Sequence, residues 1–531
     1  MASVRVTGAP YAARAPAWLV AAIACLAVLA PGVAQAGWYR AETDRFVVFG
    51  EGREQRVRDY AAKLMTFDRV LRVFHPSTMD KIPATKLTVY LLNDRSDMRR
   101  VMPQAPLTLG GFYTALPEKV FAVALDETAT GGSDDVMFHE YAHHFMREYF
   151  PAAYPAWFVE GFAEYFATAE IKSGSVAVGG FSPQRVYGIL GQTWLPMEEV
   201  LSRTTAETRK ERLNAYYSQS WLLTHYMRSS PEREVQLDNA TRAIGRGEPP
   251  VKAFEEATGM SMAELTKALR GYRKLSRLGV KNPFPTPPPM TVTQMPRSAD
   301  DLLLDEARLI MAQKGRVDGE FLAAVRRKAA KYPGDALAEL VLARAEFVMG
   351  DVTAGRAIMT RRLEAHPEDK EALILAGTGE VFAGIREPAA RTERFRAARP
   401  LFAKAYAIDK QDFRPLYFYA MSRSIESVYP TDNDLKALLE ARALAPAVQE
   451  ISLRAGLALL KKGDPKRAAI VLGPVINNPH GGRAAAQAKA LLAGARVSES
   501  EIESVGDEQE TPPPTEPPAA QPAKPAGATT P

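Results

Sequence analysis

The chain has almost no cysteine. Its 531 residues include one, Cys25, which lies within an apolar run near the N-terminus. A single thiol cannot form an intramolecular disulfide, and Cys25 lies in a segment that we expect to be removed, so the mature chain would offer no thiolate ligand. Any metal site in this protein must therefore be built from histidine and carboxylate side chains.

The chain also has little net charge and no concentrated basic segment. Its formal charge of +5 is small for its length, and no run of lysine and arginine is interleaved with aromatic residues. Nucleic-acid binding requires basic residues gathered on one face, so we expect no nucleic-acid partner. The apolar content of 46% and charged content of 24% are ordinary for globular protein. The length predicts about two to four domains.

Only one segment is apolar for long enough to act in targeting. Arginines precede the apolar run Ala17–Leu29, and Ala34-Gln35-Ala36 follows it. This order predicts a signal peptide over residues 1–36, cleaved after Ala36. The run is shorter than the roughly 20 residues of a membrane-spanning helix, which disfavours the alternative of a membrane anchor. We therefore expect an exported protein, periplasmic or secreted, with no membrane span in the mature chain.

Strand and helix patterns alternate after the predicted cleavage site. Residues 45–50 and 86–92 are short, rich in β-branched side chains and bounded by turn residues, which predicts strands. Between them, residues 54–74 carry apolar side chains at helical spacing. Residues 110–125 indicate two strands joined by a turn. We expect a small mixed sheet here, followed by helices from Ser133 onward, where Ser133, Asp134 and Asp135 offer N-caps.

Proline and glycine mark the organisation of the second half. The proline density of residues 281–296 forbids helix and predicts an extended linker. Beyond it, Pro333, Pro367 and Pro446 each precede a helical pattern with a small residue ten positions later and a glycine seventeen positions later. The 34 residues from Pro333 to Pro367 match the length of a tetratricopeptide (TPR) unit. The pattern over 297–496 resembles TPR repeats, which could bind a protein partner; generic helical hairpins are the alternative.

These patterns divide the chain. We predict a mixed domain over residues 37–280, the linker, a separable helical array, and a tail over residues 497–531. The tail is acidic and proline-rich with almost no large apolar side chain, so it cannot bury enough surface to become ordered.

Three of the seven histidines fall within six positions. His139 and His143 are four residues apart and so lie on one face of a helix, where two imidazoles can converge on one cation. Glu140 is placed to hold a water on that cation. His-Glu-x-x-His rarely arises by chance with so few histidines, so the spacing indicates a zinc site rather than an ordinary helical hairpin with polar residues.

A catalytic zinc needs three protein ligands and an open position. Glu160 can supply the third ligand from a second helix, because the 16 residues after His143 allow a proline-bounded reversal and one further turn. Glu164 lies one helical turn beyond Glu160. It can accept a hydrogen bond from the far ring nitrogen of a ligand histidine and fix its tautomer.

The segment from His139 to Tyr165 resembles the gluzincin metallopeptidases, in the peptidase MA-like group related to thermolysin and the zinc aminopeptidases. The resemblance rests on H-E-x-x-H and on W-x-x-E-G-x-A-E-Y, and it extends over about residues 40–275. It implies an α+β chain, in which a thermolysin/gluzincin-like catalytic domain over 37–280 precedes the all-α TPR-like array. It also implies zinc (Zn2+) at His139, His143 and Glu160, with Glu140 as general base.

The resemblance further implies a peptide or protein substrate that pairs with an edge strand within residues 110–125. No G-x-M-E-N-type stretch precedes the helix, so an endopeptidase or a narrow processing enzyme fits at least as well as an aminopeptidase. A tyrosine downstream should assist the oxyanion, and Tyr217 in Y-S-Q-S-W fits best. Equally, Tyr217 and Tyr216 could simply pack on a helix.

The remaining histidines carry little signal. We expect His144 to be structural or on the surface, and His225 to lie on a helix surface rather than line the cleft. His75, His366 and His480 are isolated in the sequence. The pattern as a whole predicts an exported zinc peptidase. The alternatives are a periplasmic scaffold in which the zinc is structural, and hydrolysis of a non-peptide amide by the same residues.

Overall fold

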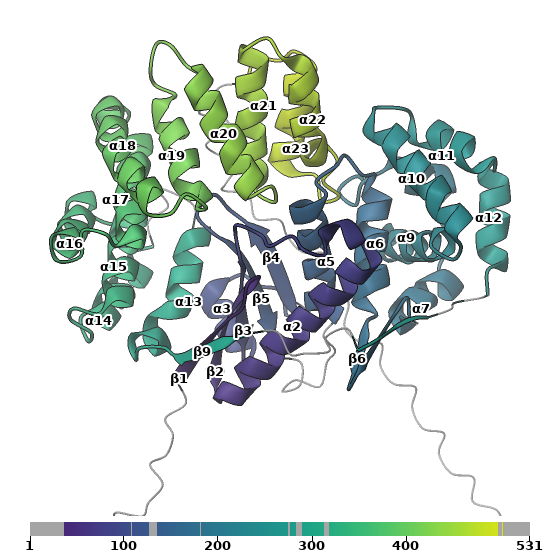
Figure 1. The fold of residues 1–531 in the computed structure, drawn as a ribbon, viewed down its shortest axis with the longest axis horizontal. Helices are drawn as coiled ribbons and strands as arrows, with labels where there is room; N and C mark the ends of the chain where they lie inside the picture. The colour runs from purple at the N-terminus through teal and green to yellow at the C-terminus, as the bar shows by residue number, and fades with distance from the viewer. Residues whose placement is uncertain are drawn as a thin grey trace, which may run out of the picture.

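The computed structural model describes residues 37–107, 109–126, 135–180, 182–273, 275, 277–282, 289–312, 318–497 and 502. The predicted signal peptide and nearly all of the predicted tail lie outside this part of the chain, as do Ser133 and Asp134. The described residues form a mixed α/β structure with a six-stranded sheet, a smaller sheet and many helices (Figure 1). Across these residues, no helix combines the length and apolar character needed to cross a bilayer.

The main sheet has the strand order β4-β5-β3-β2-β1-β9. The pairs β2–β3 and β3–β5 are parallel, and the other pairs are antiparallel. The strands expected at 45–50, 86–92 and 110–125 are confirmed, and β4 lies at an edge of the sheet, whereas β1 and β9 were not anticipated. The bounds are β1 Gly37–Glu42, β2 Phe46–Gly52, β3 Leu87–Leu92, β4 Gly111–Ala115, β5 Val120–Leu125 and β9 Thr291–Gln294.

Both faces of this sheet are covered. Alternate residues of β3 and β5 pack on one side against α2 (Glu54–Phe74) and α5 (Asp135–Tyr149). The intervening residues pack on the other side against α3 (Arg95–Val101) and α13 (Ser298–Met311). Because β3 and β5 are buried on both faces, their sequences are continuous apolar runs rather than alternating ones. The helix predicted over 54–74 is confirmed residue for residue.

The predicted linker carries part of the sheet. Strand β9 lies within residues 281–296 and pairs with β1, so this part of the segment is extended and is joined to the sheet of the domain before it. Directly after it, α13 buries Leu303, Leu304 and Ile310 in the same cluster as Tyr90 and Phe121 of the sheet. The first helix of the predicted array is thus packed on the preceding domain, and separability of the array stays a prediction.

A helical layer follows α5 and contributes to the site. It contains α9, which was expected near 214–230, α12, which was expected near 261–275, and a small sheet in the order β6-β7-β8. Its elements are α6 Ala156–Ala167, β6 Glu170–Lys172, β7 Ser175–Val178, α7 Pro183–Gly191, α8 Met197–Ser202, α9 Leu213–Met227, α10 Pro231–Gly245, α11 Pro250–Thr258, α12 Met262–Gly271 and β8 Leu278–Lys281.

From α14 onward the helices form an arc, green to yellow in Figure 1, that runs from beside the sheet to above α5. A Cβ at Gly377 would lie 2.5 Å from Phe402, and one at Gly456 would lie 2.5 Å from Leu472, so these small residues permit close helix contacts. The TPR assignment itself stays a prediction. The helices are α14 Gly319–Ala329, α15 Ala336–Met349, α16 Val352–Ala365, α17 Lys370–Arg386, α18 Arg391–Ile408, α19 Phe413–Arg423, α20 Asp432–Leu444, α21 Gln449–Lys461, α22 Pro465–Ile476 and α23 Gly482–Leu492.

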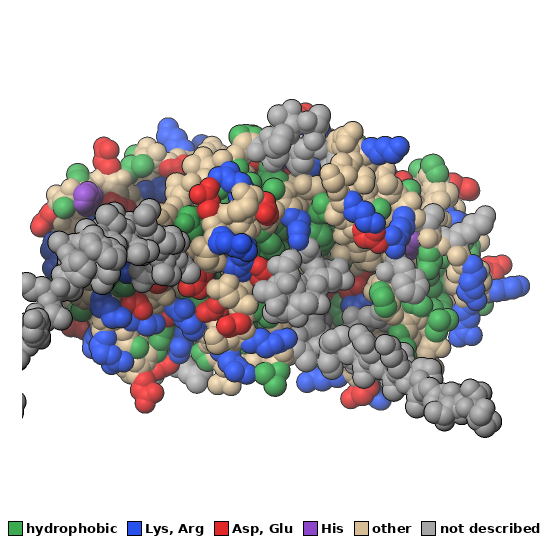
Figure 2. Space-filling view, turned by 90° about the horizontal axis from the view of Figure 1, so that it is seen from below, with side chains coloured by type: hydrophobic (Ala, Val, Ile, Leu, Met, Phe, Trp, Pro, Cys, Tyr) green, Lys and Arg blue, Asp and Glu red, His purple; other side chains and the backbone are tan. Residues whose placement is uncertain are grey.

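The surface charge is mixed rather than segregated. On the face shown in Figure 2, the described lysine and arginine side chains lie among aspartates and glutamates. Within the array, arginines pair with glutamates of neighbouring helices, as in Arg326–Glu346 and Arg356–Glu380. Since Arg326 and Arg356 are about half exposed, solvent screens these pairs and each contributes little to stability.

Candidate metal centre

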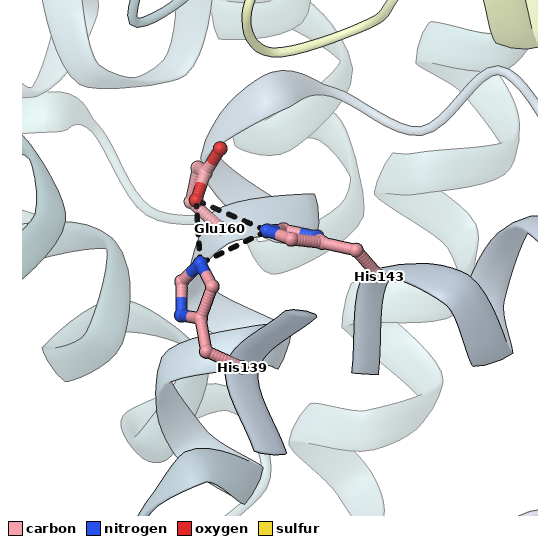
Figure 3. Close-up of side chains that lie close together, drawn as sticks. All are labelled: His139, His143 and Glu160. Carbon is pink, nitrogen blue, oxygen red and sulfur yellow. Dashed lines mark hydrogen bonds and ion pairs between the residues drawn. The ribbon is translucent and has the colours of Figure 1, made fainter. Parts of the chain in front are cut away.

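Two consecutive helices bring the three expected ligands together. His139 and His143 lie one turn apart on α5, and Glu160 lies in the first turn and a half of α6, which begins after Pro155. All three side chains are buried. Figure 3 shows both imidazoles pointing at the carboxylate.

The distances suit one cation. The Nε2 atoms of His139 and His143 are 3.0 Å apart, and Glu160 Oε2 is 3.6 Å and 3.5 Å from them. Two ligand atoms each about 2 Å from a tetrahedral ion would be separated by about 3.3 Å. These residues could therefore hold a metal ion.

The buried donor atoms have few other partners. Among the described residues, neither oxygen of Glu160 has a hydrogen-bond partner, and Nδ1 of His143 has none either. A buried carboxylate without hydrogen bonds is costly unless a positive charge compensates it. The imidazoles of His143, His480 and His139 outweigh burial and hold the pKa of Glu160 well below its usual range. The donor set of two imidazoles and one carboxylate thus fits a divalent cation.

A second carboxylate orients His139. Glu164 Oε1 is 3.3 Å from His139 Nδ1, which is the ring nitrogen that faces away from Glu160. Arg185 of α7 donates two hydrogen bonds of 2.6 Å to Glu164, one to each oxygen. Burial opposes the charge on Glu164, but Arg185 and His139 lower its pKa to about 2. Glu164 is therefore a fixed anion that leaves His139 Nε2 directed at the ligand group.

The two carboxylates and burial shift the pKa of His139 in opposite directions. Burial lowers the pKa of His139, but the carboxylates of Glu160 and Glu164 outweigh this and raise it to about 10. For His143 burial prevails and lowers the pKa to about 4. The site thus favours a positive charge on the His139 side, where a proton or a cation can supply it.

The expected catalytic residues lie beside this group. Glu140 follows His139 on α5 and is half-buried. Tyr217 of α9 is buried, and burial together with the charge of Glu160 raises its pKa well above the usual range. The charges of Glu164 and Glu140 act in the same direction. The hydroxyl of Tyr216 donates to the backbone oxygen of Arg203 at 2.8 Å, although burial and the charge of Glu160 raise the pKa of Tyr216 as well.

Two other histidines have structural surroundings. His144 is buried and its Nδ1 is 3.1 Å from the hydroxyl of Tyr113, so it joins α5 to edge strand β4. The expectation of a surface position for His225 is wrong. Its ring is buried between the Tyr272 hydroxyl at 2.8 Å and the Gly179 carbonyl at 3.2 Å, because α9 is covered on all sides.

His480 is the residue that sequence reasoning missed. It lies in the loop between α22 and α23, and its Nε2 is 3.5 Å from Glu160 Oε1. The centroids of its ring and that of His143 are 6.1 Å apart. No local pattern marks it, since 320 positions separate it from Glu160. The only hint in the sequence is the run asparagine-proline-histidine-glycine after a helix, which indicates a loop but not its neighbour.

Comparison with known proteins adds little. No family model matches the chain. A stretch of 67 residues is 37% identical to part of a maleylacetate reductase of Sphingobium indicum. The match covers 12% of this chain and 19% of that protein, so it spans far less than two thirds of the relative's length. A match of this extent does not place the chain in a family.

Proposed function

We propose that this protein is an exported zinc-dependent peptidase of the gluzincin type. The observation that supports the proposal best is the buried group of His139, His143 and Glu160, with donor atoms directed at one point and Glu140 beside it. Two imidazoles and a carboxylate form a typical donor set for catalytic zinc, which keeps one position open. When bound, the ion would act as a Lewis acid that activates water and polarises a carbonyl.

Proton transfer is assigned to Glu140. Its carboxylate accepts a proton from the attacking water and later passes it to the leaving amine. Glu164 and Arg185 keep His139 in one tautomer during this exchange. Tyr217 is assigned to donate a hydrogen bond from its hydroxyl to the developing oxyanion.

The substrate is proposed to bind along β4. Among the described strands, β4 pairs with β5 alone, and it contacts α5 through Tyr113 and His144. An extended peptide or protein segment could add to the free edge by backbone hydrogen bonds, which would bring a peptide bond past α5. The array over 297–496 is proposed to bind a protein partner through TPR-like repeats, and the predicted export places the enzyme in the periplasm or outside the cell.

The test is Glu140→Gln, measured for zinc content and for hydrolysis of an unfolded protein. We expect full zinc occupancy, an unchanged fold and a rate about a hundred- to ten-thousand-fold lower. Glu148→Gln on the same helix is the matched control. Burial raises the pKa of Glu148 to about 8, so a neutral amide resembles its protonated form and activity should persist.

Two results would contradict the proposal. If Glu140→Gln cleaves as fast as the parent, Glu140 is not the base. If the parent binds zinc but cleaves no peptide, the alternative of a periplasmic scaffold with a structural zinc site is favoured.

A further inference from the structure

The loop between α22 and α23 reaches the metal centre from the far end of the array. Its residues 477–481 follow the last turn of α22, and His480 lies 3.5 Å from Glu160 Oε1. The yellow-green segment above Glu160 in Figure 3 belongs to this C-terminal part of the chain. A residue of the array thus lies against a proposed ligand of the preceding domain.

Three contacts fix this loop to the domain that carries the site. The backbone oxygen of Pro479 accepts hydrogen bonds from the Thr205 hydroxyl at 2.7 Å and the Thr205 N–H at 3.0 Å. Arg147 of α5 donates to Asn478 Oδ1 at 3.3 Å. A Cβ at Gly481 would lie 3.0 Å from the Cβ of Ala206, and this glycine has a φ of +67°, so the close approach requires glycine there. The loop is therefore held on both sides of His480.

The two oxygens of Glu160 face different partners. Oε2 is directed at His139 and His143, whereas Oε1 is the atom beside His480. Glu160 is fully buried, and its oxygens have no hydrogen-bond partner among the described residues. A carboxylate with free rotation could turn either oxygen, or both, toward a cation. A nitrogen next to Oε1 favours the orientation in which only Oε2 is presented.

His480 itself is not grouped with the ligands. Only the ligand atoms of His139, His143 and Glu160 lie within 4.8 Å of one another in the described part of the chain. We propose that His480 is a positioning residue that holds Glu160 through Oε1, and that the C-terminal end of the array is thereby a working part of the metal centre. This inference rests on the proposed metal site but does not depend on peptide hydrolysis.

The test is metal affinity of the full mature chain, measured by competition of zinc with a chelator. His480→Ala should weaken binding about ten- to a hundred-fold, as is typical when the partner of a ligand is removed. His480→Gln keeps an N–H donor near the same position and should restore most of the affinity. Loss with Ala and recovery with Gln is a pattern that a merely structural role would not produce.

Two further variants separate the possible causes. His366→Ala is the matched control, because His366 is an exposed histidine of the same array and its loss should leave affinity unchanged. Thr205→Val removes the hydroxyl that donates to the Pro479 backbone oxygen and also lies 3.4 Å from His480 Nδ1. It should weaken zinc binding in the same direction, even if His480→Ala fails to fold. The visible spectrum of the cobalt-substituted protein should also change in His480→Ala, because the Glu160 ligand reorients.

The outcomes distinguish this inference from the proposed site. If the parent chain binds neither zinc nor cobalt, the metal site itself is wrong. If the parent binds zinc and His480→Ala and Thr205→Val bind it equally well with an unchanged cobalt spectrum, only the role of His480 is overturned.

Discussion

Gly161 follows the ligand Glu160 at the point where α6 and α9 come closest, and it offers a sharp test of the geometry. A Cβ added at Gly161 would lie 2.1 Å from Thr224 Oγ1 and 2.4 Å from the backbone oxygen of Ser220. An ordinary contact to Cβ begins at 3.4 Å. The side chain of Thr224 can rotate, but the backbone of Ser220 cannot yield without a movement of the helix. Gly161→Ala should therefore push α6 from α9 by about 1 Å.

The magnitude follows from two opposing terms. Overpacking of this kind typically costs about 1–3 kcal/mol, and the better helix propensity of alanine returns about 0.5–1 kcal/mol. We expect a net loss of about 1–2 kcal/mol in stability. The effect on the site should be larger, because metal–ligand distances tolerate about ±0.2 Å and Glu160 moves with the helix. Zinc affinity should fall at least about tenfold.

Thermal unfolding and chelator competition measure the two effects in Gly161→Ala. Gly271→Ala is the matched control, since Gly271 also lies in a helix and a Cβ there would meet nothing within 4 Å. It should be neutral or slightly stabilising. Adding Thr224→Ala to Gly161→Ala should recover only part of the loss, because the Ser220 contact remains. Unchanged stability and zinc affinity in Gly161→Ala would refute this account of how α6 is placed.

Two further predictions concern electrostatics. Arg185→Met removes both hydrogen bonds to Glu164 and leaves that buried anion beside His139 only. Zinc affinity should therefore fall about ten- to a hundred-fold. Equal affinity in parent and variant would count against an orienting role of Glu164. His75 is surrounded by Phe145, Phe150 and Phe162, and burial lowers its pKa from 6.5 to about 4. The folded state favours the neutral form of His75. Its contribution to the free energy of unfolding is therefore complete above pH 6.5 and is lost progressively down to pH 4. The loss should reach about 2 kcal/mol, which is less than the full pKa shift implies because the ring is partly exposed. Urea unfolding of His75→Phe should lack this part of the pH dependence, and an identical profile for parent and variant would contradict the assignment.

Local patterns predicted the local parts of the structure well. The helix over 54–74 and the buried strands at β2, β3 and β5 follow from periodicity and β-branched runs, because each pattern reports burial of one element. His139 and His143 were found because helix geometry converts a spacing of four residues directly into proximity. Glu160 was found because the 16 residues after His143 allow a reversal and a further turn of a second helix. Strands β1 and β9 were missed, since strands that are only partly buried, such as β9 at the edge and β1 beside it, have a weak apolar pattern.

Contacts between distant segments were beyond the reach of sequence patterns. The packing of α13 on the sheet and the approach of His480 to Glu160 both join residues far apart in the chain. Nothing in the sequence near Pro479 indicates that its backbone oxygen will accept hydrogen bonds from Thr205. Such contacts depend on how distant elements pack against one another, which a single sequence does not reveal.

The charges around the site explain why the histidines lie next to Glu160. Glu160 and Glu164 place two buried carboxylates within reach of His139, whereas Arg185 pairs only with Glu164. Of these two carboxylates, Glu160 is the one whose charge is not balanced by a guanidinium. Its pKa is nevertheless held below the usual range by neighbouring imidazoles. Burial of an unbalanced carboxylate is unfavourable in a protein interior. A divalent cation between His139, His143 and Glu160 would remove that penalty. The same argument accounts for the position of His480, whose ring lies at the remaining oxygen of Glu160 and can offset part of the charge from the other side.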